Sequence, residues 1–225
     1  MALYREPAAA GDSALVRFLE AQGPDTTLAI SHVRRATRGE ITLANTQPFA
    51  RLLAGRMHVF AHNGDLPGIE RSRAVEVDRF RPVGATDSEY AFCALLGRMD
   101  ALWGLSQAPP ALNRRIEVVA QFAADLRELG PANFLYSDGE TLFAHGHRRL
   151  HADTGIVGPP GLFIHSCECE DPGEPKHATG VSVAAGFQKM SMIASVPLSE
   201  ESWRPLSEGE VAAVRAGEVV RSAFS

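Results

Sequence analysis

The spacing of apolar residues predicts three helices. Residues 13–22 have a short amphipathic pattern, and a longer pattern follows Thr86. Thr86 and Glu89 match the Ser/Thr-x-x-Glu capping box that opens a helix, so the long helix should begin there. A second long helix is expected over residues 113–129, because a Gly-Pro pair follows it directly. The side chains expected to face the core are Leu15, Phe18, Leu19, Phe92, Leu95, Leu96, Met99, Leu102, Ile116, Val119, Phe122 and Leu126.

Strands are expected on both sides of the two long helices. Residues 27–33 are rich in β-forming side chains, and residues 57–62 form an apolar run that ends at Asn-Gly. Residues 133–137 and 140–145 flank an Asp-Gly pair, which is a hairpin signal. Further strands are expected at 162–165 and 190–196. Two helices between two groups of strands favour a layered α+β fold over a βαβ repeat.

Composition limits the class of protein. The chain has 225 residues, of which 45% are hydrophobic and 22% charged, so we expect a single domain over residues 1–225. A net charge of -5 argues against a nucleic-acid partner. No apolar run approaches the ~20 residues of a membrane span, and the first residues lack the pattern of a signal peptide. Three cysteines form no complete disulfide framework. We therefore expect a cytoplasmic protein without membrane contact.

The cysteines and histidines indicate neither a metal nor a cofactor. Cys167 and Cys169 have the wrong spacing for a structural zinc site, and no second cysteine pair exists. Cys93 falls on a predicted helix beside its apolar face, where core packing is the expected role. The histidines near residues 145–151 have no carboxylates at matched spacing. No bound cofactor or metal ion is therefore expected.

Three polar clusters can carry chemistry. Residues 32–39 place three arginines after an expected strand, and a guanidinium group can hold a carboxylate. Asn63 and Gly64 can direct a side-chain amide and a backbone N–H at one spot, as in an oxyanion hole. Asp87, in the first turn of a helix, can hold an ammonium group. Each cluster alone also fits an ordinary turn or helix cap, but together they suit an amino-acid ligand.

The ordered motifs of the chain resemble those of class II glutamine amidotransferases. They are HVRRATRG at 32–39, NTQPF at 45–49, AHNGDL at 61–66 and TDSE at 86–89. The small stand-alone bacterial members are the most similar, and FLYSDG at 134–139 and IASVPL at 193–198 also fit them. The resemblance implies the four-layer αββα sandwich of N-terminal nucleophile hydrolases. It covers nearly the whole chain.

The resemblance also implies roles for individual residues. Arg34 matches the arginine that holds the α-carboxylate of glutamine, and Thr37 matches the threonine that supports this pocket. Asn63 and Gly64 match the two donors of the oxyanion hole. Asp87 matches the aspartate that receives the α-ammonium group. In the family, a cysteine at the mature N-terminus attacks the side-chain amide, releases ammonia and forms a glutamyl thioester that water hydrolyses.

One part of the family pattern is missing. Position two is Ala2, and no cysteine precedes Cys93. Residues 1–7 resemble the family pattern just after its first strands, so we expect a chain that lacks those strands and the nucleophile. A misplaced start or a fragment, with the true start upstream, explains this better than a shortened, non-catalytic relative, because losing strands would expose a sheet edge. As written, the chain is expected not to hydrolyse glutamine.

Other functions stay open at this stage. A hydrolase of γ-glutamyl amides other than glutamine would share the same pocket, and so would a non-catalytic module that binds glutamine or glutamate. A purely structural protein would make the three clusters coincidental. The sequence identifies neither an ammonia-accepting partner nor an oligomeric state.

Overall fold

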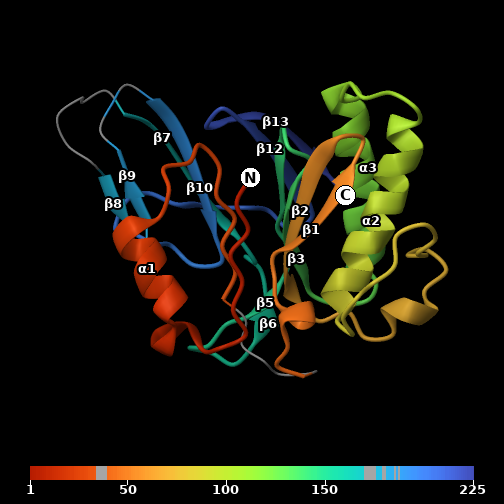
Figure 1. The fold of residues 1–225 in the computed structure, drawn as a ribbon, viewed down its shortest axis with the longest axis horizontal. Helices are drawn as coiled ribbons and strands as arrows, with labels where there is room; N and C mark the ends of the chain where they lie inside the picture. Colours follow the sequence, from red (N-terminus) through yellow and green to blue (C-terminus); the bar gives the residue numbers. More distant parts are fainter. Residues whose placement is uncertain (34–39, 170–175, 179–180, 185, 187) are drawn as a thin grey trace.

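Two β-sheets face each other at the centre of the molecule (Figure 1). The computed structural model describes residues 1–33, 40–169, 176–178, 181–184, 186 and 188–225. The larger sheet has six strands in the order β1-β2-β3-β4-β12-β13, and neighbouring strands are antiparallel. Its strands are β1 (Phe49–Leu53), β2 (Arg56–Gly64), β3 (Ala132–Ser137), β4 (Leu142–His145), β12 (Glu210–Arg215) and β13 (Glu218–Phe224).

Two long helices cover one face of the larger sheet, on the right in Figure 1. They are α2 (Asp87–Trp103) and α3 (Leu112–Arg127), close to the predicted bounds. Their apolar faces fill the main core together with the sheet, and the predicted inward residues of both helices are buried there, with Leu102 partly exposed. The ring of Phe92 stacks on Phe60 of β2, with centroids 5.5 Å apart. Helical periodicity therefore identified the side of each helix that packs on the sheet.

The second sheet lies on the other face of the larger one. Its strand order is β10-β7-β11, with β7 (Phe163–Cys169), β10 (Gln188–Ala194) and β11 (Arg204–Pro205). Two small ribbons pair β5 (Arg149–Leu150) with β6 (Val157–Gly158), and β8 (Lys176–Ala178) with β9 (Val181–Val183). Helix α1 (Ala14–Gln22) lies on the far side from α2 and α3. The order helix, sheet, sheet, helix is the expected four-layer αββα sandwich.

Short 3-10 turns and tight hairpins complete the chain. The turns are η1 (Ala10–Asp12), η2 (Leu43–Asn45) and η3 (Ile69–Arg71). Strands β1 and β2 are joined by Ala54-Gly55, and β12 and β13 by Ala216-Gly217; all four residues have positive φ. Such left-handed pairs match the right-handed twist of the strands that they join. The pattern of the sequence did not predict β1, β12 or β13, because Ala-Gly is a weak turn signal.

The N-terminal region differs from the prediction in two ways. Residues 27–33 form no strand; instead the Thr26 hydroxyl bonds both the N–H and the carbonyl of Leu28. A local side-chain bond of this kind competes with strand pairing. Helix α1 begins as predicted, with Ser13 capping the N–H of Val16 at 2.9 Å. Its apolar face is not buried, however, and Phe18 is 47% exposed.

The capping box of α2 is only half formed. The Thr86 hydroxyl accepts a hydrogen bond from the N–H of Glu89 at 3.2 Å, as expected. The Glu89 carboxylate does not return to Thr86: it accepts the N–H of Gly84 at 2.6 Å and pairs with Arg51 of β1. Glu89 is 1% exposed, so this ion pair fixes the start of α2 against the edge strand of the sheet.

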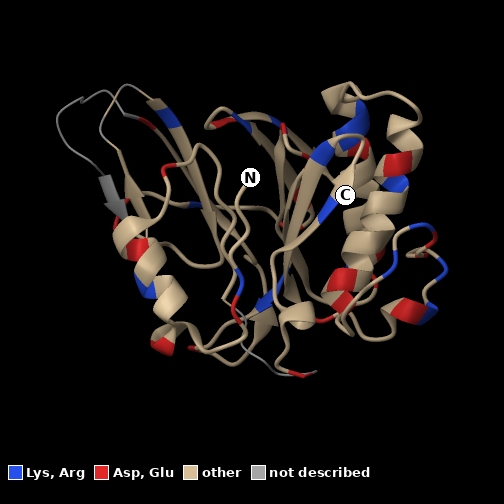
Figure 2. Cartoon of the chain, in the orientation of Figure 1, with Lys and Arg blue, Asp and Glu red and all other residues tan. Residues whose placement is uncertain are grey.

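Charged residues outside the core lie mainly on the helices and loops (Figure 2). Acidic and basic positions are interspersed along α2 and α3, and Arg98 of α2 pairs with Asp125 of α3 at 2.6 Å. This pair joins the two helices where Arg98 also lies over the ring of Phe122. Among the residues described, no helix is long and apolar enough to cross a membrane.

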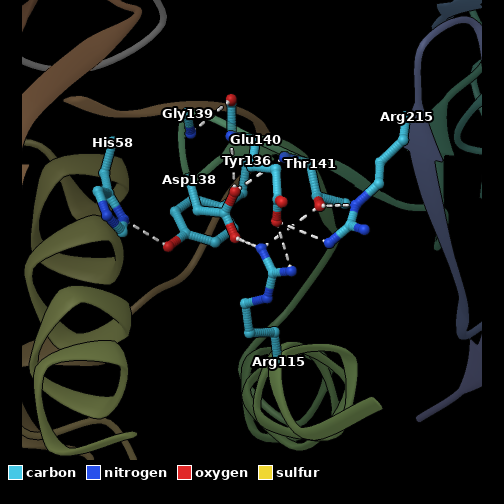
Figure 3. Close-up of polar contacts among 9 residues, drawn as sticks. His58, Arg115, Tyr136, Asp138, Gly139, Glu140, Thr141 and Arg215 are labelled. Atoms are coloured by element: carbon cyan, nitrogen blue, oxygen red, sulfur yellow. Dashed lines mark hydrogen bonds and ion pairs between the residues drawn. The ribbon is translucent and has the colours of Figure 1, made fainter. Parts of the chain in front are cut away.

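A buried ionic cluster holds the β3–β4 hairpin to α3 (Figure 3). Arg115 of α3 is 1% exposed and donates to Asp138 and Glu140, both at 2.6 Å. Arg215 of β12 approaches Glu140 from the other side at 2.7 Å and donates to the Thr141 hydroxyl at 2.8 Å. Asp138 also accepts the N–H groups of residues 140 and 141. We call these five residues the hairpin cluster.

Candidate functional site

The end of β2 presents its side chains to two different layers. Successive residues of a strand point to opposite faces of the sheet. His62 points toward the helices, where its Nδ1 lies 2.9 Å from the hydroxyl of Ser88. Asn63 points toward the second sheet, where its side-chain amide donates to the Ser195 hydroxyl at 3.1 Å. His62 is buried and Asn63 is exposed. The strand therefore offers the Asn63 amide to a ligand while His62 supports it from behind.

Gly64 permits a close approach that other residues would prevent. A Cβ atom at this position would lie 1.8 Å from the Pro131 carbonyl oxygen and 2.6 Å from Nε2 of His62. The next residue, Asp65, donates its N–H to the same Pro131 carbonyl at 3.1 Å. The strand end is thus held against the start of β3, with the Gly64 backbone exposed.

Asp87 lies at the same place, although it is 23 residues further along the chain than Gly64. Its Oδ2 accepts the N–H of Leu66 at 2.8 Å, two residues beyond Gly64. Its Oδ1 accepts the N–H and the hydroxyl of Ser88, at 2.7 and 3.2 Å. A carboxylate has about four acceptor positions, so these three bonds leave capacity for another donor. The structure therefore brings Asp87 together with Asn63 and Gly64.

His62, Ser88 and Asp87 form a hydrogen-bonded chain that supports the site. Burial lowers the pKa of the His62 ring to about 4, although Asp87 acts in the opposite direction. The ring is therefore neutral at pH 7. Ser88 is 5% exposed and stands between His62 and Asp87 rather than beside a substrate. It connects the strand to the helix and is not placed as a nucleophile.

Gln47 also supports the strand end. Its side-chain amide pairs with both backbone groups of His62, accepting from the N–H at 2.6 Å and donating to the carbonyl at 3.0 Å. Nε2 of His32 lies 3.1 Å from the same carbonyl. The sequence placed Gln47 in a family motif but assigned it no role. These contacts bring residue 32 next to the site, whereas Arg34 and Thr37 lie outside the described residues.

Cys93 is not placed as a nucleophile. Cys93 is fully buried on α2, and burial raises the pKa of its thiol to about 11. This confirms its predicted role in core packing. Cys167 is half-buried on β7. Within the described residues, no group of three histidine, cysteine or acidic side chains could hold a metal ion.

A cavity of about 290 Å³ has Pro131 in its lining. Its lining includes His147, Arg148 and Glu208, but neither Asn63 nor Asp87. Arg148 already pairs with Glu208 at 2.8 Å, and His147 lies 3.5 Å from the same carboxylate. The cavity is therefore separate from the candidate site.

The fold is that of the N-terminal nucleophile hydrolases: two facing sheets between helices, with an Asn-Gly strand end beside an aspartate that opens a helix. The chain belongs to the class-II glutamine amidotransferases, since the model of that family matches residues 1–225.

Individual relatives agree with this family. YafJ of Escherichia coli (strain K12), named a putative glutamine amidotransferase, is 31% identical over 210 residues, which are 92% of this chain and 77% of YafJ. The uncharacterized protein MJ1515 of Methanocaldococcus jannaschii is 30% identical over 98% of this chain and 59% of its own. The crystal structure of a predicted glutamine amidotransferase from Pseudomonas aeruginosa PA01 is similar with a TM-score of 0.67 and 30% identity, covering 84% of this chain and 70% of that one.

Proposed function

We propose that this protein binds glutamine and serves the hydrolysis of its side-chain amide to glutamate and ammonia. The observation that carries the proposal is the exposed Asn63 amide next to Gly64, with the Asp87 carboxylate bonded to the same segment through Leu66. An amide donor, a backbone N–H and a carboxylate match the polar groups of a γ-glutamyl ligand in its reacting form.

In the proposed reaction, a cysteine thiolate adds to the amide carbon of glutamine, and the carbonyl oxygen becomes an oxyanion. The Asn63 amide and the Gly64 N–H stabilise this charge. The carbon–nitrogen bond then breaks, ammonia leaves with a proton, and a glutamyl thioester remains. Water hydrolyses the thioester, which releases glutamate and restores the thiol. Asp87 accepts the substrate ammonium group, and Arg34, supported by Thr37, binds its carboxylate.

The thiol in this reaction belongs to the first residue of the mature chain, whose α-amine acts as the base. Cys93 does not meet this requirement, because it is buried within α2 and its pKa is raised to about 11. For a chain that begins Met1-Ala2 we therefore propose binding without turnover, and for a chain whose first residue is cysteine we propose turnover. A non-catalytic glutamine-binding module is the second candidate, favoured by the burial of Cys93.

Intact mass and N-terminal sequencing of the protein from its native cells decide between the two candidates. A mature N-terminal cysteine, with ammonia released from glutamine, supports the hydrolase. A mature chain that starts at Met1 or Ala2 and binds glutamine without releasing ammonia supports the binding module. Ammonia release by a chain of that second kind would contradict the proposed chemistry.

Calorimetry with L-glutamine tests the pocket itself. Asp87→Asn removes the charge that pairs with the ammonium group and should weaken binding by about tenfold or more, since a charged hydrogen bond contributes ~1.5–3 kcal/mol. Asn63→Ala should change binding little, but should lower turnover of the cysteine-initiated chain by about 10²–10³. Matched controls are Asp78→Asn and Asn113→Ala, which are exposed and lie outside the site motifs. Unchanged affinity in Asp87→Asn would exclude this pocket.

We also propose a reducing, cytoplasmic location, because Cys93 is a free thiol. Free thiols persist where the glutathione and thioredoxin systems keep cysteine reduced. Cell fractionation followed by thiol labelling of the native protein tests this, and recovery in an oxidising compartment would contradict it.

A further inference from the structure

One buried side chain beside the strand end has no role in the proposed reaction. Asn133, near the start of β3, is 1% exposed. Its amide donates to the carbonyl of Asn63 at 3.0 Å and to the carbonyl of Arg148 at 2.7 Å. Its Oδ1 accepts the N–H of His147 at 2.7 Å. Both amide hydrogens of Asn133 are therefore used on backbone groups of two separate segments.

Asn133 is placed for this by the pairing of β2 and β3. It lies directly opposite Asn63 in the register, so the two side chains share the face that looks toward the second sheet. The loop before β7 closes over the amide. A Cβ atom at Gly161 would lie 1.6 Å from Oδ1 of Asn133, so only glycine fits there. The end of β2, the segment at residues 147–148 and the loop at Gly161 thus all contact the carboxamide of Asn133.

The bond from the Asn133 side chain reinforces the direction that the β2–β3 pairing gives to the Asn63 carbonyl, and with it the direction of the Gly64 N–H. The carbonyl of Asn63 and the N–H of Gly64 belong to one peptide unit, which is planar, and trans because the cis bonds of the described chain are elsewhere. In a trans peptide the two groups point in opposite directions. With its oxygen held by Asn133, the unit must direct the Gly64 N–H away from β3, toward the edge where Gln47 pairs with His62.

Glycine makes such a restraint necessary. Gly64 is the last residue of β2 and has access to backbone angles that other residues avoid, so the β2–β3 pairing is weakest at this peptide and the Asn133 side chain adds to it. On its far side, the N–H of Asp65 is held by the Pro131 carbonyl at 3.1 Å. The peptide unit that carries the oxyanion donor is thus restrained from both sides by β3.

We propose that Asn133 is a positioning residue that sets the orientation of the Asn63–Gly64 peptide and thereby forms the oxyanion hole. The proposal rests on the proposed function for its consequence in catalysis, but the orientation itself does not depend on glutamine. Asn133→Asp keeps the shape and removes both donors, so that a carboxylate faces two carbonyl oxygens. The peptide should then turn away from β3.

Residual dipolar coupling of the Gly64 N–H measures this orientation directly in the ligand-free chain. We expect the coupling to change in Asn133→Asp and in Asn133→Ala, while couplings of β12 and β13 stay as in the wild type. The matched control is Asn45→Asp, another buried asparagine with backbone partners, which should leave the Gly64 coupling unchanged. An unchanged Gly64 coupling in a folded Asn133 variant would overturn the proposal.

A second variant covers the case in which Asn133 substitutions fail to fold. Gly161→Ala keeps the Asn133 side chain but places a methyl group against its Oδ1. It should therefore also change the dipolar coupling of the Gly64 N–H. In a chain that begins with cysteine, Asn133→Asp should lower kcat by about 10²-fold at unchanged KM, as expected for a misplaced donor. A rise in KM alone would contradict a role in the transition state. Failure of glutamine binding in the wild type would reject the proposed function and leave the dipolar coupling as the test of Asn133.

Discussion

The two ends of β3 carry polar clusters of opposite character. At the end of the strand, the hairpin cluster joins Arg115 to Asp138, and both side chains are at most 2% exposed. At its start, Asn133 holds the backbone of Asn63, whose side chain is exposed. The Arg115–Asp138 pair at the centre of the first cluster satisfies its charges internally and is closed to a ligand. The second uses buried groups to orient donors that remain accessible, which is the property that a binding site needs.

Two histidines of β2 extend this comparison. Burial lowers the pKa of both His58 and His62 to about 4. The ring of His58 is hydrogen-bonded to the buried Tyr136 hydroxyl at 2.7 Å (Figure 3). The ring of His62 is hydrogen-bonded to the Ser88 hydroxyl, which in turn is hydrogen-bonded to Asp87. A strongly shifted pKa therefore does not by itself distinguish a site from a structural contact. The partner of the histidine and the exposure of the next residue make that distinction.

The largest effect should come from the hairpin cluster. Arg115→Met leaves Asp138 buried without its partner and should lower the free energy of unfolding by about 3–5 kcal/mol. Urea denaturation measures this loss. Arg114→Met, an exposed neighbour on the same helix, should cost less than about 1 kcal/mol. Glutamine affinity of the molecules that remain folded should be unchanged in both variants. A weakened affinity in folded Arg115→Met would show that the two clusters are not independent.

A smaller effect should come from pH. Both histidines have folded pKa values below the ordinary value of 6.5, so below that pH the unfolded chain binds protons that the folded chain does not. Stability should therefore be complete above about pH 6.5 and fall progressively toward pH 4. Thermal unfolding between pH 7.5 and 4.5 measures this loss.

Single substitutions separate the two histidines. His58→Gln and His62→Gln should each flatten the dependence of stability on pH, because each removes one group that titrates differently in the folded and unfolded states. Only His62→Gln should also disturb glutamine binding, through Ser88 and Asp87. Equal effects of the two variants on binding would reject the distinction drawn between them.

The smallest effect should come from the partner of the exposed amide. Ser195→Ala removes the acceptor of the Asn63 side chain, in a bond that solvent can replace. Stability should change by about 0.5 kcal/mol or less, and turnover of a cysteine-initiated chain by less than about tenfold. Ser199→Ala, which removes the acceptor of the Trp203 indole instead, is the control. A loss as large as that of Asn63→Ala would mean that Ser195, and not the restraints from β3, orients the amide.

Half of the strands of the large sheet and both long helices could be predicted from the chain, because their signals are local. Helical spacing identified the buried faces of α2 and α3, and Asp138-Gly139 marked the β3–β4 turn. The incorrect predictions concern strands, because a strand forms only where it pairs with a segment that is distant along the chain. Residues 27–33 have β-forming side chains but pair with no described strand, and β12 enters the large sheet between β4 and β13 with no local signal.

The candidate site was predicted only in part. Asn63, Gly64 and Asp87 were identified because they fall in short motifs that resemble a family, and the structure brings them together. Asn133 and Gln47 were given no role, because their partners are backbone groups of strands that meet only after pairing. No spacing rule in one sequence reports a side chain that bonds the main chain of another strand.

By itself, the sequence determined which segments become helices, where the β3–β4 turn falls and which residue types are available for chemistry, because these depend on neighbours within a few positions. The tertiary structure alone decided which polar groups are closed and which are accessible. Asp138 and Asp87 are both acidic residues next to an element boundary, and only packing makes one a buried ion pair and the other a half-buried acceptor beside an exposed amide. The physical reason is that desolvation depends on every segment that surrounds a group, however distant that segment is along the chain.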